Sequence, residues 1–102
     1  MSETVRMEDP ISARFLGHTP SGEGTVGTSA IVISARDEGK AFTIVHTLAA
    51  NTDTVYIGGS GVTTGLGVPL VADRFITIPG SAAVYAIAGA ASQGYRIITG
   101  TK

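Results

Sequence analysis

From Thr25 onward the chain is a series of short apolar segments, separated about every ten residues by small and polar residues that form turns. The segments are rich in β-branched and aromatic residues and are short for helices. This pattern predicts an all-β fold, a small antiparallel β-sandwich. The expected strands are Ala30–Ser34, Ala41–Leu48, Thr54–Gly58, Arg74–Ile78, Ala83–Ala88 and Tyr95–Thr99. Thr25–Thr28 can extend the first strand, and Pro69–Val71 can form a short edge strand.

The strand Ala83–Ala88 is apolar on both of its faces. In a sandwich of this size only one face of each sheet lies inside the subunit. We therefore expect the second apolar face to meet another subunit, although alanine also tolerates exposure. The candidate intersubunit residues are Val84, Ala86 and Ala88. Arg96, on the last strand, is expected either to form an ion pair between subunits or to be solvated.

Residues 1–24 are polar or weakly apolar and end in a stretch rich in Gly, Thr, Pro and Ser, so we expect an N-terminal arm before a sandwich domain of residues 25–102. Ser12–Leu16 is a candidate strand within this extended arm. Such a segment can add a strand to a neighbour's exposed sheet edge, or it can remain a disordered tail. We favour docking, with Ile11, Ala13, Arg14, Phe15 and Leu16 as the contact residues.

The run from Val55 to Leu70 begins as a strand and continues with glycines at positions 58, 59, 61, 65 and 67. This density indicates a backbone that takes positive φ values or passes close to other parts of the chain. The run lacks the Lys-Ser/Thr ending of a phosphate-binding loop, and no helix is predicted after it. We interpret it as a packed loop that also contacts a partner, through Gly59, Ser60, Val62, Thr63 and Thr64.

Composition narrows the functional classes. A chain of 102 residues with 43% hydrophobic residues is enough for one domain with one core. The absence of cysteine excludes disulfides and thiolate chemistry. A formal net charge of −1 argues against a nucleic-acid-binding surface. Only 15% of the residues are charged, below the roughly 25% of typical domains, which suggests that a partner covers part of the surface.

We expect a soluble protein, or one assembled onto something soluble, because no secretory signal and no apolar stretch long enough to span a bilayer is visible. Catalysis has little support. His18 and His46 show no metal-ligand spacing, and His46 is expected to be partly buried and hydrogen-bonded. The carboxylates Asp37, Glu38, Asp53 and Asp73 fall in predicted turns, where Asp usually binds its own backbone. We therefore expect no catalytic residue, cofactor or metal site.

Four segments, Val55–Thr63, Gly67–Leu70, Val84–Ala88 and Tyr95–Ile98, together resemble a pattern of small virion structural proteins of tailed bacteriophages. The resemblance covers the chain from about Thr25 onward, with the element order preserved. It implies a structural β-module of jelly-roll type, and more specifically a capsid decoration, or cement, protein. Such a protein would bind the major capsid protein on the outer surface of the head, most simply as a homotrimer.

Two alternatives stay open at this point. The first is another virion component, such as a head-fibre base, a neck or tail accessory protein, or a receptor-binding accessory. The second is a carbohydrate-binding β-sandwich, although such modules usually present exposed Trp or Tyr platforms. This chain has no Trp and three Tyr, all within predicted strands.

Overall fold

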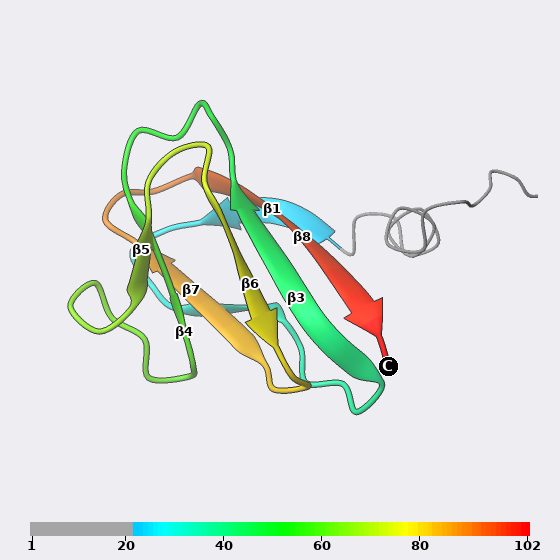
Figure 1. The fold of residues 1–102 in the computed structure, drawn as a ribbon. Coiled ribbons are helices and arrows are strands. Elements are labelled where there is room, and N and C mark those ends of the chain that lie inside the picture. Colours follow the sequence, from blue (N-terminus) through cyan, green and yellow to red (C-terminus); the bar gives the residue numbers. More distant parts are fainter. Residues whose placement is uncertain (1–21) are drawn as a thin grey trace, which may run out of the picture.

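A computed structural model describes residues 22–102, which form eight β-strands and contain no helix (Figure 1). The expected fold class is confirmed. The strands are β1 Gly22–Val26, β2 Ile31–Ser34, β3 Lys40–Thr47, β4 Val55–Gly58, β5 Val68–Leu70, β6 Phe75–Pro79, β7 Val84–Ala88 and β8 Gln93–Thr101. The strand expected at Ser12–Leu16, the other contact residues of the arm and His18 lie outside the described residues.

The strands form two four-stranded sheets, with the orders β1-β8-β3-β6 and β2-β7-β4-β5. Every neighbouring pair is antiparallel. The pairs β1–β8, β2–β7, β3–β6 and β4–β5 are nested along the chain and alternate between the sheets. This nesting is that of a long hairpin rolled into two layers, and it gives the jelly-roll topology.

Six expected strands agree with the structure to within about two residues at each end, but two expectations on the N-terminal side are wrong. Thr25–Thr28 does not extend the first strand of the β2 sheet, because Thr25 lies in β1 in the other sheet. The chain passes from one sheet to the other at Gly27, whose carbonyl accepts a hydrogen bond from the Ala88 amide over 2.8 Å. Residues 22–24, which were expected in the arm, also belong to the sandwich, because Gly22 pairs with Ile97 in β8.

The core lies between the two sheets and is built mainly from small branched side chains. Its buried members are Val26, Ile33, Val45, Val55, Ile57, Leu70, Val84, Ala86, Ala88 and Ile97. Ile76, Ile78 and Tyr95 pack against this cluster and are partly buried. Among residues 22–102, every aromatic side chain thus lies at the margin of the core or on the outer faces of the sheets, which determines the surface described below.

The prediction that Val84, Ala86 and Ala88 meet another subunit is wrong, because these side chains fill the interior of the sandwich. Their exposed fractions are 3%, 0% and 1%. The outer face of β7 carries Tyr85 and Ile87 instead, and both are half-buried. β7 is therefore apolar on both faces, as expected. The face that we assigned to a partner subunit points into the core, and the opposite face points outward.

The buried polar side chains are all hydrogen-bonded among the described residues. Thr47, which is fully buried, donates its hydroxyl to the carbonyls of Val71 and Arg74. The Thr47 hydroxyl oxygen also accepts the Arg74 amide over 3.1 Å. These bonds fix the turn between β5 and β6 onto β3, because a buried hydroxyl without partners would be costly.

Candidate functional site

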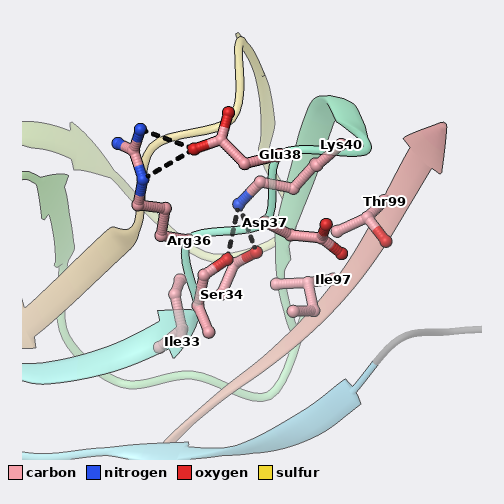
Figure 2. Close-up of a pocket in the computed structure, with 9 residues that line it drawn as sticks. Ile33, Ser34, Arg36, Asp37, Glu38, Lys40, Ile97 and Thr99 are labelled. Atoms are coloured by element: carbon pink, nitrogen blue, oxygen red, sulfur yellow. Dashed lines mark hydrogen bonds and ion pairs between the residues drawn. The ribbon is translucent and has the colours of Figure 1, made fainter. Parts of the chain in front are cut away.

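A hollow of about 550 Å³ lies at the end of the sandwich where β2 passes into β3 (Figure 2). Lys40 extends into its wall and is only 3% exposed. The Lys40 Nζ donates hydrogen bonds of 3.0 Å to Ser34 Oγ and to the carbonyls of Ala35 and Ala82. Burial lowers the pKa of the Lys40 ammonium below its ordinary value, and the Asp37 carboxylate offsets part of this effect.

The other charged side chains of this loop bind groups within the loop itself. Arg36 donates to the Glu38 carboxylate over 2.7 Å, and both side chains are largely exposed. The Gly39 amide donates to Asp37 Oδ1 over 2.9 Å, which is the local turn bond expected for this aspartate. Since all three ammonium hydrogens of Lys40 are engaged and Arg36 is paired, the hollow presents no free cationic group. We interpret Lys40 as a clamp that joins β2, β3 and the β6–β7 turn.

The glycine loop, residues 59–67, is held by a single apolar anchor. Val62 is 5% exposed and packs against Gly58 and Gly67. A Cβ added at Gly67 would lie 2.8 Å from Val62 Cγ2 and 2.7 Å from Tyr56 Cβ. Close approach therefore explains these two glycines. None of the five glycines in this run has a positive φ, so that part of the expectation is wrong.

Within this loop the candidate contact residues divide into two groups. Gly59, Ser60, Thr63 and Thr64 are exposed, as a contact surface requires. Val62 is buried in its own domain and cannot contact a partner, so its assignment as a contact residue is wrong. The physical reason is that a loop of small polar residues needs at least one apolar side chain to fix its position on the sandwich.

A polar network at the opposite end of the sandwich was not predicted from the sequence. The Gln93 carboxamide is buried and accepts the amides of Thr52 and Asp53, each over 2.9 Å. Asn51 donates to the Gly94 carbonyl over 2.9 Å and accepts the Gly94 amide over 2.7 Å. These groups are about forty positions apart in the sequence. The network closes the β3–β4 loop onto β8.

His46 is half-buried on the outer face of β3, as expected, and its Nε2 lies 3.1 Å from Asp73 Oδ1. Among residues 22–102 no group of three or more His, Asp or Glu side chains is placed to hold a metal ion. The same range contains no helix that is long and apolar enough to cross a membrane.

The outer face of the β2-β7-β4-β5 sheet is apolar and aromatic. We call it the tyrosine face. Its members are Val32, Tyr56, Pro69, Tyr85 and Ile87. Val32 pairs with Tyr85, and Tyr56 pairs with both Ile87 and Pro69, so the five side chains form two neighbouring cross-strand rows on one face of the sheet. Val32 is 49% exposed, and no layer of the described chain covers this face.

The outer face of the β1-β8-β3-β6 sheet carries a second apolar set, which we call the phenylalanine face. Its members are Phe42, Ile44, Phe75 and Ile98. Phe75 is 70% exposed, whereas the Phe42 ring lies over Gly100, where any Cβ would collide with it. On the same face Arg96 pairs with Glu23 of β1 over 3.1 Å, so its observed ion pair is within one chain.

Comparison with known proteins adds no constraint on these surfaces. The chain matches no protein-family model, no curated protein and no solved structure.

Proposed function

We propose that the chain is a virion structural protein of a tailed bacteriophage, a capsid decoration protein that binds the outer surface of the head. The segments that carry the resemblance contribute β4, β5, β7 and β8, so they lie in both sheets of one jelly roll. The tyrosine face is the observation that carries the proposal. It is an apolar patch of two neighbouring side-chain rows on a small sandwich whose interior is already filled, and such exposed patches mark interaction surfaces.

The mechanism is clamping rather than chemistry. Each copy would bury part of its tyrosine face and the exposed residues Gly59, Ser60, Thr63 and Thr64 against the major capsid protein. A homotrimer would engage several capsid subunits at once, and linked contacts raise the overall affinity without new interactions. A ligand that binds only the assembled shell stabilises the shell by mass action. The protein would be made in the host cytoplasm and assembled onto the head.

Add-back to purified heads tests the proposal. Heads that lack the protein should bind it saturably in a co-sedimentation assay, and the bound shells should open at a higher temperature. Tyr85→Glu should weaken binding by roughly tenfold or more, because it places a charge in the centre of an apolar contact. Thr25→Glu, an exposed strand position in the other sheet, is the matched control and should bind as the wild type does. Absence of saturable binding would contradict the decoration function and favour another virion position.

A second function, carbohydrate binding, is favoured by one observation. Tyr56 and Tyr85 lie on the same outer face and are half-buried, so their rings are available to a planar ligand to some extent. A glycan array separates the two functions. Saturable binding of a defined sugar that Tyr56→Ala and Tyr85→Ala abolish, together with no binding to heads, would establish the carbohydrate function.

A further inference from the structure

The two sheets have four edge strands among the described residues, and three of them carry features that oppose further pairing. β1 contains Glu23, β2 contains a register shift between Val32 and Ser34, and β5 has three residues with Pro69 at its centre. β6 differs from all of them. It has five residues, a regular register and no charged residue, and its proline is the last residue.

The peptide groups at the free side of β6 are placed to accept another strand. The Thr47 amide donates to the Arg74 carbonyl over 2.8 Å, so hydrogen-bonded pairs with β3 recur at every second residue from Arg74. Phe75 and Thr77 lie between such pairs and direct their N–H and C=O groups away from β3. Pro79 occupies the same kind of position, which proline tolerates at a sheet edge because no ladder bond is lost.

An apolar groove of about 360 Å³ lies between the two sheets beside this edge. Its apolar lining includes Ile57, Val68, Ile76, Ile78, Ala83 and Val84. Successive side chains of a strand point to opposite faces, so a strand added to β6 would place every second side chain into this groove. The free edge and the groove together fit one kind of ligand, an extended segment in which alternate residues are apolar.

We propose that residues 11–16 of a second copy of this chain form that strand. Ile11, Ala13 and Phe15 alternate with Ser12, Arg14 and Leu16, so one side of the segment is apolar, as the groove requires, and the other side is polar except at Leu16. This inference deepens the self-association that is part of the proposed function by naming the donor and the acceptor. It does not involve the capsid shell.

The sheet topology favours a second copy as the occupant. The arm joins the sandwich at Gly22 in β1, and the acceptor β6 is the opposite edge of the same sheet. Within one copy β8 and β3 separate these edges by about 14 Å, at roughly 4.8 Å per strand, and residues 17–21 would have to cross the outer face. When two copies lie edge to edge, β1 of one is beside β6 of the next. One donor and one acceptor per copy produce a head-to-tail contact, which gives a ring such as a trimer where the rotation between copies closes.

Native mass spectrometry and light scattering on the full chain test the inference. The wild type should be a homo-oligomer. Thr77→Pro removes an edge amide, and the double variant I11D/F15D places charges on the groove side of the arm. Each should raise the dissociation constant by roughly tenfold or more. The matched controls are Thr77→Val, which keeps the amide, and S12D/L16D, which adds the same charge to the other side of the arm. Both controls should oligomerise as the wild type does.

Mixing the two disruptive variants makes the test directional. The Thr77→Pro variant keeps a functional arm and I11D/F15D keeps a functional edge, so the mixture should form a 1:1 heterodimer more tightly than either variant associates with itself. Circular dichroism checks that Thr77→Pro keeps its β signal. If it does not, the arm variants and hydrogen exchange at Phe75 and Thr77 decide the matter, with slow exchange expected in the oligomer and fast exchange in I11D/F15D.

Two results would overturn the inference. The first is a wild type that stays monomeric at all concentrations; slow exchange at Phe75 and Thr77 would then show that the chain's own arm covers the edge. The second is an oligomer that both disruptive variants leave unchanged. A protein that oligomerises as described but does not bind heads would contradict the proposed function and leave this inference intact.

Discussion

Two loops leave the end of the sandwich drawn lowest in Figure 1, and each is fixed by one buried side chain. The loop between β2 and β3 is fixed by Lys40, whose ammonium donates to three oxygens, two at the end of β2 and one in the β6–β7 turn. The glycine loop is fixed by Val62, which makes no side-chain hydrogen bond and fits against Gly58 and Gly67. The Lys40 contact depends on hydrogen-bond geometry and on charge. The Val62 contact depends on the space that Gly58 and Gly67 leave because they have no side chain.

This difference shows how a small sandwich holds its loops in place with few core residues. An ammonium can reach three carbonyl or hydroxyl oxygens at once, but burying it has an electrostatic cost that appears as its lowered pKa. A valine has no such cost, but it requires neighbours that leave room for it. The two loops should therefore respond to different substitutions and to different solution conditions.

The largest effect is expected from Gly67→Ala. The new Cβ would lie 2.7 Å from Tyr56 Cβ and 2.8 Å from Val62 Cγ2, so the loop or the strand must move. We expect a loss of roughly 2–3 kcal/mol in the free energy of unfolding, measured by urea denaturation. Gly61→Ala is the matched control, because a Cβ there meets nothing within 4 Å. Equal stability of the two variants would show that Val62 does not anchor the loop.

Lys40→Met is expected to have the next largest effect. Methionine retains an apolar stem of similar length, but the Ala35 and Ala82 carbonyls lose their donor. We expect a loss of roughly 1–2 kcal/mol in the free energy of unfolding, because partly buried acceptors are left without partners. Lys102→Met, at an exposed lysine, should change stability by less than about 0.5 kcal/mol. A Lys40→Met variant as stable as the wild type would show that the Lys40 hydrogen bonds do not hold this loop in place.

The pH dependence of stability should distinguish Lys40 from Val62, because only Lys40 titrates. The folded-state pKa of Lys40 is lowered, so the unfolded chain binds more protons as pH rises through the folded value toward 10.5. The Lys40 contribution to stability should therefore rise with pH in that window and be smallest below the folded pKa. The difference in unfolding free energy between wild type and Lys40→Met isolates it, because the tyrosines titrate in both proteins. The difference between wild type and Val62→Ala should stay constant over the same window.

The strands were predictable because alternation along the chain directly reflects burial on one side of a sheet. The inner face of β7 was not, because Val84-Tyr85-Ala86-Ile87-Ala88 is apolar on both faces. One signal was present: a tyrosine hydroxyl needs a polar partner or water, which favours placing Tyr85 outward and the alanines inward. The Gln93 and Asn51 networks could not be predicted, since their partners are about forty positions away. Burial of Lys40 was equally hidden, because a lysine in a turn is ordinarily solvated.

The smallest effect is expected from Glu38→Gln, which lies in the same loop as Lys40 and sharpens the comparison. The Arg36–Glu38 ion pair is short, at 2.7 Å, but its side chains are 65% and 75% exposed. Exposed pairs contribute little because water screens the charges and two long side chains must be ordered. We expect a change of less than about 0.5 kcal/mol in the free energy of unfolding, and less still in high salt. If Glu38→Gln were as destabilising as Lys40→Met, the exposed ion pair would hold this loop as strongly as the buried Lys40 does. The two loops would then differ in whether an exposed or a buried contact fixes them.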